Sequence, residues 1–217
     1  DTDSGKTIVT GLIAKFLLSE NKKVITQKLV QTGCTGIADD ILIHRKIMGI
    51  DLLPEDISQV TCPFVFSHSS SPELAASLEN KNIDIDIIYK NTNQLSESHE
   101  FVLLEGAGGF MVPVTKDKMI IDIINENQYE LILVSNPKLG SINHTLLSLE
   151  ICRKYDILLK AVIYNNYPVT DKHILNNSRQ VIKEYLINKF PKVFFMDVPF
   201  VDIKKVPVIN FESIVFN

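Results

Sequence analysis

The sequence lacks several features that would have placed it in other classes of protein. No apolar run reaches the roughly 18 residues that a membrane-spanning helix needs, and no signal peptide is visible. The cysteines are odd in number and far apart (Cys34, Cys62 and Cys152), which predicts reduced thiols rather than a disulfide framework or a zinc site. No internal repeat, low-complexity tract or linker-like stretch is present. We therefore expect a single domain over residues 1–217 that is cytoplasmic and does not contact a membrane.

An excess of basic residues is also missing. The 22 Lys and Arg residues are outnumbered by 26 Asp and Glu residues, which gives a net charge of −4. Surfaces that bind nucleic acid are usually basic, so we expect no nucleic-acid partner. A hydrophobic content of 45% over 217 residues is ordinary for a globular chain that can bury a full core.

The chain begins with DTDSGKT, which has the pattern of the second half of a phosphate-binding loop. The first glycine of such a loop and the strand before it would precede residue 1, so we expect a few upstream residues. Lys6 would neutralise the outer phosphates, and the Thr7 hydroxyl would ligate Mg²⁺. The alternative is an ordinary capped helix start with an incidental lysine.

Hydrophobic periodicity predicts an alternation of helices and strands. Helices are expected over Lys6 to about Asn21, over Asp39–Met48 with a stop at Gly49, from Pro72, over much of Ile83–Ser96, and from about Ser141. Strands are expected in Lys23–Val30, in FVLLE ending at Glu105, in LILVS, in AVIYN ending near Asn165, and in Val193–Phe195, whereas Thr61–Ser71 reads as irregular. This alternation predicts an α/β fold with a mostly parallel sheet covered by helices on both faces.

Polar and glycine-rich stretches follow the predicted strands, at the sheet edge where such folds bind ligands. Glu105 ends an apolar strand, where its carboxylate needs a partner, either a metal or a structural hydrogen bond. Asp39 and Asp40 begin a helix, where acidic residues are common without any function, and a role as a second metal carboxylate is the alternative. Lys28 ends a strand, either as a surface residue or as a charge directed at the site, and Thr32 follows it in a loop.

The segment KLGSINH places a loop of small residues before a predicted helix. Backbone N–H groups at a helix start suit an anion such as a substrate carboxylate. An ordinary helix cap by Ser141 is the alternative. His144 has no evident partner in the sequence and is assigned no catalytic role.

Taken together, these segments resemble the dethiobiotin synthetase family. DTDSGKT resembles its phosphate loop, KLVQTG its lysine segment, SSSPELAA its Ser-Pro helix start, EGAGGFMVP its acidic strand end and PKLGSINH its substrate loop, in the family's order over nearly the whole chain. The resemblance implies a P-loop NTPase-like three-layer sandwich and a cytoplasmic ATP-dependent ligase of biotin biosynthesis. It implies that CO₂ and 7,8-diaminononanoate form a carbamate, then a carbamic-phosphoric anhydride, and finally dethiobiotin, ADP and phosphate. It also implies ATP and Mg²⁺ as cofactors and a homodimer with substrate at the interface.

The same resemblance implies roles for individual residues. The implied catalytic residues are Lys6, Lys28, Thr2 and Thr32. The implied ATP-binding residues are Asp3, Ser4, Gly5, Lys6, Thr7, Asn165, which would read adenine, and Pro199, which would flank it. The implied Mg²⁺ ligands are Thr7, Glu105 and one of Asp39 or Asp40, with Asp40 preferred for its spacing from VQTG. The residues implied to bind the diamine are Thr2, Asp3, Lys28, Thr32, Ser71, Gly108, Gly140, Ser141, Ile142 and Asn143.

Two departures from the family pattern affect fine geometry rather than charged groups. Lys28-Leu29-Val30 stands where the family usually has Lys-Pro-Val, and Ser71-Pro72-Glu73 stands where it has Ser-Pro-His. The missing proline could loosen the backbone that directs Lys28.

Two other readings compete with the ligase. One is a P-loop ATPase of the partitioning or cell-division-site type, but such proteins usually carry an additional lysine early in the loop. Their membrane-binding relatives tend to end in a basic amphipathic helix, which PVINFESIVFN is not. The other is a non-catalytic nucleotide-binding module, which has no need of Lys28 in addition to Lys6.

Overall fold

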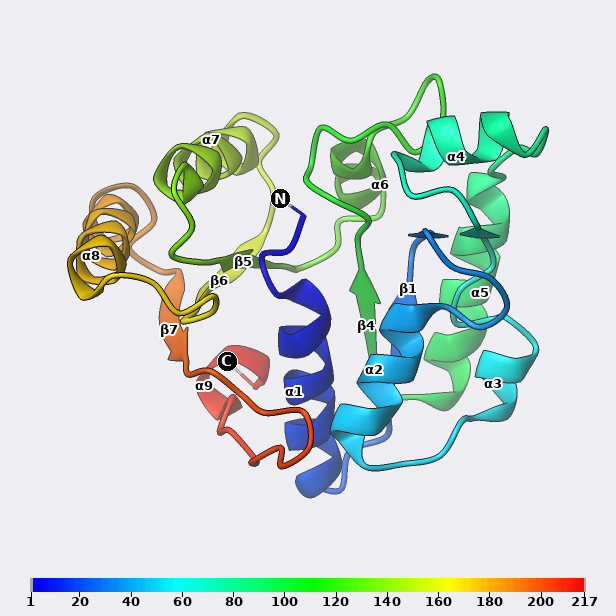
Figure 1. Cartoon of the computed structure of the whole chain (residues 1–217), viewed down its shortest axis with the longest axis horizontal. Coiled ribbons are helices and arrows are strands. Elements are labelled where there is room, and N and C mark those ends of the chain that lie inside the picture. Colours follow the sequence, from blue (N-terminus) through cyan, green and yellow to red (C-terminus); the bar gives the residue numbers. More distant parts are fainter. Residues whose placement is uncertain (1, 217) are drawn as a thin grey trace. The chain divides into compact units, whose positions relative to one another are not determined.

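Helices and strands are interspersed along residues 2–216, which the computed structural model describes (Figure 1). The helices are α1 (Lys6–Ser19), α2 (Asp39–Met48), α3 (Pro54–Ile57), α4 (Pro72–Leu78), α5 (Ile85–Ser98), α6 (Ile120–Glu126), α7 (Ser141–Lys154), α8 (Lys172–Lys189) and α9 (Glu212–Val215). The strands are β1 (Val24–Lys28), β2 (Gln31–Thr32), β3 (Val65–Phe66), β4 (Phe101–Glu105), β5 (Leu131–Ser135), β6 (Leu159–Asn165) and β7 (Phe194–Val198). The paired strands run parallel: β1 with β4, β2 with β3, and β6 with both β5 and β7.

The chain divides into two compact units. The first comprises Asp1–Val9, Ile121–Asp202 and Phe211–Asn217, and the second comprises Thr10–Ile120 and Ile203–Asn210. Each unit has its own parallel strands and its own covering helices.

In the first unit, β6 is the central strand, and its last five residues are all buried. Because successive side chains of a strand point to opposite faces, this burial requires cover on both sides. Helices α7 and α8 form one cover, through a cluster that includes Leu149, Val162, Tyr164, Ile182 and Leu186. Figure 1 shows α7 and α8 on one side of these strands and α9 on the other.

In the second unit, β1 and β4 pair in register, with Lys28 opposite Glu105 at their carboxyl ends. Thr26 and Lys28 lie on one face of β1, whereas Gln27 points to the other. The Thr26 hydroxyl contacts side chains of α2, and Gln27 accepts a hydrogen bond from the Thr92 hydroxyl of α5. Helices therefore cover both faces of this strand pair as well.

The predicted fold class, α/β with parallel strands covered by helices, is confirmed in both units. The predicted helix starts are found at Lys6, Asp39, Pro72 and Ser141, and the predicted strand ends at Glu105 and Asn165. Gly49 ends α2 in the left-handed conformation, with φ 75° and ψ 34°, as expected for a glycine stop.

Some elements were not predicted from the sequence. Helix α8 is the largest of them, and it begins where the Asp171 carboxylate accepts hydrogen bonds from the backbone N–H groups of His173 and Ile174. Helix α6 was also missed, and the stretch read as irregular before Pro72 contains the short strand β3. Strand β1 ends at Lys28, two residues before its predicted end.

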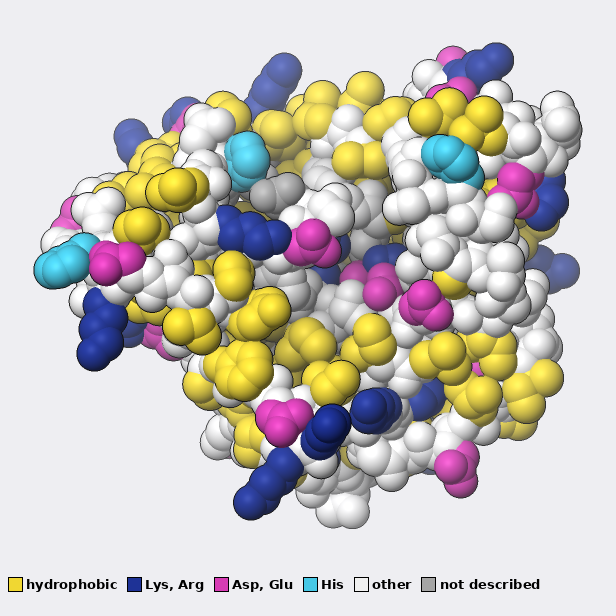
Figure 2. Space-filling view, in the orientation of Figure 1, with side chains coloured by type: hydrophobic (Ala, Val, Ile, Leu, Met, Phe, Trp, Pro, Cys, Tyr) yellow, Lys and Arg dark blue, Asp and Glu magenta, His cyan; other side chains and the backbone are white. Residues whose placement is uncertain are grey.

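The surface and the thiols agree with the composition. On the face shown in Figure 2, Lys and Arg side chains are interspersed with Asp and Glu. All three cysteines are free, with Cys62 and Cys152 buried. Among residues 2–216, no helix combines the length and the apolar character needed to cross a membrane.

Candidate active site

Residues 2–5 form a loop that leads directly into helix α1, and Lys6–Val9 of that helix belong to the first unit. Asp3 and Gly5 both have positive φ, at 56° and 94°. Ser4 is buried between them, and α1 begins at Lys6 with Thr7 in its first turn. A loop followed at once by a helix start is the arrangement that attracts phosphate, through backbone N–H groups and the helix dipole.

Asn165 supports this loop from the end of β6. Its side chain is 4% exposed, and its Nδ2 donates a hydrogen bond to the Ser4 carbonyl oxygen over 3.1 Å. A Cβ atom on Gly5 would lie 2.1 Å from the same Nδ2, so the contact requires glycine at that position. Asn136 holds the loop in a similar way, with its Nδ2 3.0 Å from the Asp3 carbonyl oxygen. The structure thus places Asn165 against the phosphate loop.

An exposed aromatic pair follows the ends of β6 and β7. The rings of Tyr167 and Phe200 have centroids 5.6 Å apart and are tilted by 34°. Phe200 comes directly after Pro199, the residue that the resemblance places beside the adenine base. Sequence reasoning did not single out Tyr167, although an aromatic residue close after Asn165 was the available signal.

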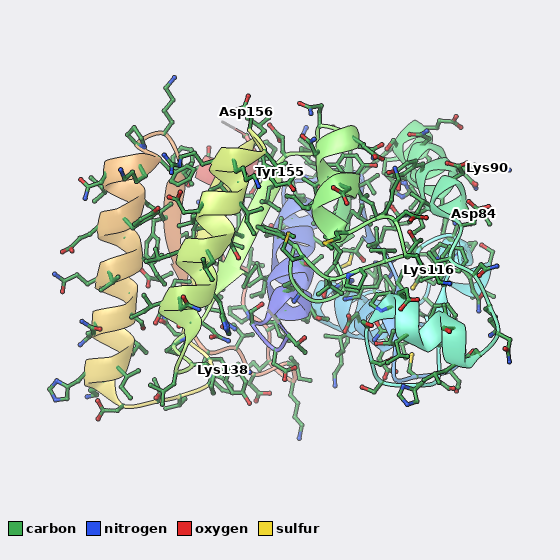
Figure 3. All side chains as sticks on the ribbon, turned by 90° about the horizontal axis from the view of Figure 1, so that it is seen from above. Asp84, Lys90, Lys116, Lys138, Tyr155 and Asp156 are labelled. Atoms are coloured by element: carbon green, nitrogen blue, oxygen red, sulfur yellow. The ribbon has the colours of Figure 1, made fainter. Side chains whose placement is uncertain are left out.

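The predicted substrate loop precedes α7 in the same unit. Gly140 has φ 87° and caps the helix, and Ser141 follows as its first residue. The Ser141 side chain is 5% exposed, and within the described chain its Oγ has no hydrogen-bond partner. In Figure 3, Lys138 marks this end of α7, and Tyr155 and Asp156 mark the other. The alternative reading of this segment, a helix cap by the Ser141 side chain, is therefore wrong.

The second unit brings Lys28, Asp40 and Glu105 together. Lys28 Nζ lies 2.5 Å from Asp40 Oδ2 and 2.9 Å from Glu105 Oε1. Of the two adjacent aspartates, Asp40 is the one whose carboxylate pairs with Lys28. Lys28 and Glu105 are 5% and 4% exposed, so the ammonium and its partner carboxylate are largely removed from water.

The charges in this cluster control one another. Burial alone would lower the pKa of Lys28, but the negative charges of Glu105 and Asp40 outweigh it and raise that pKa above its usual value. Burial alone would raise the pKa of Glu105, but the Lys28 charge and a hydrogen bond from His44 lower it to about 2. Both groups are therefore ionised at neutral pH.

A second layer of buried polar side chains lies behind this cluster, and the sequence did not predict it. His44 of α2 is 0% exposed, with Nε2 2.9 Å from Glu105 Oε2 and Nδ1 3.0 Å from Thr26 Oγ1. Arg45 donates to Thr26 Oγ1 over 2.8 Å and binds both carboxylate oxygens of Asp56, over 2.7 and 2.8 Å. A spacing of four residues, which puts Asp40 and His44 on one face of α2, was the signal available for His44.

The remaining predicted residues of the second unit occupy loops and helix starts. The Thr32 hydroxyl donates to the Ser70 carbonyl oxygen over 3.0 Å. Ser71 precedes α4 without capping it through its side chain. Gly108 has φ 83°, and a Cβ there would lie 2.9 Å from Val112 Cγ2. The glycine therefore lets the backbone turn tightly just after Glu105.

The predicted Mg²⁺ ligands are divided between the two units. Thr7 belongs to the first unit, and Asp40 and Glu105 belong to the second. Among residues 2–216, no group of three or more His, Cys, Asp or Glu side chains is arranged to hold a metal ion. The carboxylates of Asp40 and Glu105 do supply the hard oxygen donors that Mg²⁺ prefers, and both approach one cationic group, the Lys28 ammonium.

A glycine loop leading into a helix, with parallel strands whose ends carry the charged residues, defines a P-loop nucleotide-binding α/β protein. A protein-family profile described as an AAA domain matches residues 1–193. The solved structure of pnob8 ParA has a TM-score of 0.52 and 12% identity, and the match covers 98% of this chain and 76% of that one. At that identity the likeness shows the fold alone, and the expected P-loop NTPase-like fold is confirmed.

Closer relatives define the family. The chain is 56% identical over 171 residues to the ATP-dependent dethiobiotin synthetase BioD 2 of Haemophilus influenzae. This match covers 79% of this chain and 90% of that protein. It is 48% identical over 195 residues to the ATP-dependent dethiobiotin synthetase BioD 2 of Pasteurella multocida, and the match covers 90% of this chain and 92% of that protein. It is 47% identical over 182 residues to the ATP-dependent dethiobiotin synthetase BioD of Chlorobaculum tepidum, and the match covers 84% of this chain and 76% of that protein. The chain belongs to the dethiobiotin synthetase family and is an enzyme of the ligase type.

Proposed function

We propose that this protein joins CO₂ to 7,8-diaminononanoate at the expense of ATP, with Mg²⁺, and releases dethiobiotin, ADP and phosphate. One amine would attack CO₂ and lose a proton to give a carbamate. The γ-phosphoryl group of ATP would pass to a carbamate oxygen, giving a carbamic-phosphoric anhydride and ADP. The second amine would then attack the carbonyl carbon, closing the five-membered ring and expelling phosphate. Relatives named as ATP-dependent dethiobiotin synthetases support this reaction.

The observation that carries the proposal is the buried cation at the carboxyl ends of β1 and β4. Lys28 is 5% exposed and is held between Asp40 and Glu105. A protein that only binds nucleotide would gain little stability from burying a lysine in this way, because the desolvation penalty of buried charges can exceed the energy of their mutual attraction. In a phosphoryl-transfer enzyme, a fixed ammonium stabilises the negative charge that develops on the carbamate and on the transferred group. We assign Lys28 that role, with Thr32 as a neighbouring hydroxyl.

The donor set fits a hard divalent cation. Asp40 and Glu105 present carboxylate oxygens, and Thr7 would add a hydroxyl. Bound Mg²⁺ would neutralise phosphate charge during transfer. Because Lys28 Nζ now holds an oxygen of each carboxylate, the proposal requires this lysine to share or release them when the cation is present.

The first unit would bind the nucleotide. Lys6 would neutralise the outer phosphates, with Ser4 and Gly5 holding phosphate oxygens through the backbone. Asn165 is hydrogen-bonded to the same loop through the Ser4 carbonyl oxygen. An adenine base that contacts Asn165 would therefore contact a residue that is already linked to the phosphate loop. The aromatic pair of Tyr167 and Phe200 offers an apolar face for that base.

The substrate carboxylate would bind at the start of α7. The buried Ser141 Oγ needs a hydrogen-bond partner, and Gly140 to Asn143 offer backbone N–H groups at a helix start. Thr2, Asp3, Ser71 and Gly108 would complete the contacts to the diamine. We extend the proposal to one catalytic domain over residues 1–217, acting in the cytoplasm as a homodimer with substrate at the interface.

Phosphate release from ATP and Mg²⁺ tests the proposal, measured with and without 7,8-diaminononanoate and bicarbonate, with dethiobiotin detected by mass spectrometry. We expect release to require both the diamine and the carbon source. Release that ignores the diamine would instead support a switch-type ATPase, and tight ATP binding without release would support a binding module.

A further inference from the structure

His44 is a buried histidine with a partner on each ring nitrogen, and none of the roles proposed above uses it. Its side chain is 0% exposed on α2, and it links Thr26 of β1 to Glu105 of β4. Glu105 Oε2 lies on His44, and Glu105 Oε1 lies on Lys28. The orientation of this carboxylate is therefore fixed at both oxygens.

The hydrogen atoms in this chain of contacts can be assigned one by one. Arg45 NH1 can only donate, so it occupies an acceptor position of Thr26 Oγ1. The single hydrogen of the Thr26 hydroxyl then needs an acceptor, and His44 Nδ1 lies 3.0 Å away. If Nδ1 accepts that hydrogen, the imidazole carries its own hydrogen on Nε2 and donates it to Glu105 Oε2.

The other assignments leave a conflict. With the hydrogen on Nδ1 alone, the lone pair of Nε2 would face the Glu105 carboxylate at 2.9 Å, and two acceptors repel at that distance. With hydrogens on both nitrogens, an imidazolium would share the Thr26 oxygen with the Arg45 guanidinium, and the Thr26 hydrogen would lose its acceptor. Both would be costly at a site removed from water.

We propose that His44 is a positioning residue for Glu105, whose Nδ1 accepts a hydrogen bond from the Thr26 hydroxyl and whose Nε2 donates one to Glu105 Oε2. This contact leaves Glu105 Oε1 as the oxygen that faces Lys28 and, under the proposed function, the divalent cation. Removing the hydrogen-bond partner of a metal ligand typically lowers metal affinity or activity by about 10–100-fold. The kinetic part of the inference rests on the proposed function, whereas the placement of the hydrogens does not.

Two substitutions separate the two contacts of the ring. The amide nitrogen of glutamine can take the place of Nε2, so His44→Gln keeps a donor for Glu105 and gives up Thr26. The amide oxygen of asparagine can take the place of Nδ1, so His44→Asn keeps an acceptor for Thr26 and gives up Glu105. We expect kcat of His44→Asn to fall by about 10–100-fold with little change in KM for the diamine. We expect His44→Gln to keep at least ten times the kcat of His44→Asn. Equal losses in the two variants would overturn the proposal, because they would show that packing alone matters.

Nitrogen NMR of the ligand-free wild-type protein gives a readout that is independent of activity. The His44 resonances can be assigned as those that vanish in His44→Gln. We expect a protonated Nε2 and an unprotonated Nδ1 at neutral pH, and a hydrogen on Nδ1 would refute the assignment. This result stands even if the wild-type protein makes no dethiobiotin, so failure of the proposed function and failure of this inference can be told apart.

A pair of variants at Thr26 covers the case in which His44→Asn does not fold. Thr26→Val removes the hydroxyl that fixes the tautomer, and Thr26→Ser keeps it at similar size. We expect Thr26→Ser to have the higher kcat, with Nε2 still the protonated nitrogen in its spectrum. Equal kcat values and unchanged His44 resonances in Thr26→Val would count against the proposal.

Discussion

Lys28→Met removes the ammonium that Asp40 and Glu105 share, while keeping most of the apolar stem. In the wild-type protein, Lys28 Nζ lies 2.5 Å from Asp40 Oδ2 and 2.9 Å from Glu105 Oε1. Glu105 is 4% exposed, so its charge would remain buried without the Lys28 ammonium. Breaking a buried ion pair from one side costs about 3–5 kcal/mol. We expect the free energy of unfolding of the metal-free variant, measured with urea, to fall by about this amount.

The same variant should respond more strongly to a divalent cation. In the wild-type protein the Lys28 ammonium competes with a cation for both carboxylates, whereas in Lys28→Met this competing charge is absent. A ligand at 100 times its Kd stabilises a fold by about 2.7 kcal/mol, so saturating Mg²⁺ should restore a large part of the loss. Under the proposed function, turnover should nevertheless fall about 10²–10³-fold, because the charge that we assign to transition-state stabilisation is gone.

The control for Lys28→Met is Lys160→Met, which breaks a pair with the exposed Glu130 and should cost at most about 1 kcal/mol. The unfolding curves are compared with and without Mg²⁺ at matched ionic strength. If Mg²⁺ stabilised wild-type and Lys28→Met equally, the carboxylates would not form a cation site that the lysine occupies. If Lys28→Met were as stable as wild-type, the ion pairs would not hold the cluster together.

Three further predictions test other parts of the structure. Gly5→Ala should weaken binding of a fluorescent ATP analogue far more than Gly36→Ala, because both have positive φ but only Gly5 would place its Cβ 2.1 Å from an amide nitrogen. Asp56→Asn should cost about 3–5 kcal/mol at neutral pH, because it leaves the Arg45 guanidinium buried without its carboxylate. Burial would raise the pKa of Asp56, but the Arg45 hydrogen bonds outweigh it and lower that pKa below 3.8, so its stabilisation is present above that pH and lost on acidification. The variant should therefore show a shallower loss of unfolding free energy below about pH 4. Ser141→Ala should leave stability almost unchanged but raise KM for the diamine with kcat retained, which steady-state kinetics would reveal.

The elements that could be predicted are those bounded by residues with strong local preferences. Gly49 ends α2 and Pro72 begins α4 for reasons that lie within a few residues of each. Helix α8 is more polar than the other long helices, α1, α5 and α7. Its buried residues, Ser178, Ile182 and Leu186, form only a narrow stripe, which gives a weak helical pattern in the sequence. Strands β2 and β3 are two residues long and are fixed by pairing with each other, which no local pattern indicates.

The residues of the candidate site differ in the same way in how far the sequence alone could single them out. Lys28 and Glu105 could be singled out as candidates because a charge at the end of a predicted strand is conspicuous in a sequence, and the family resemblance then implied their roles. Thr26, His44 and Arg45 could not, because each is ordinary in the middle of a strand or helix and becomes informative only through contacts made by the folded chain. Burying so many charged and polar groups contributes little net stability, since desolvation offsets most of their mutual attraction. Their concentration behind one carboxylate is therefore better explained by the need to hold Glu105 and Lys28 in fixed positions than by the stability of the fold. For this reason we include the second layer in the proposed active site.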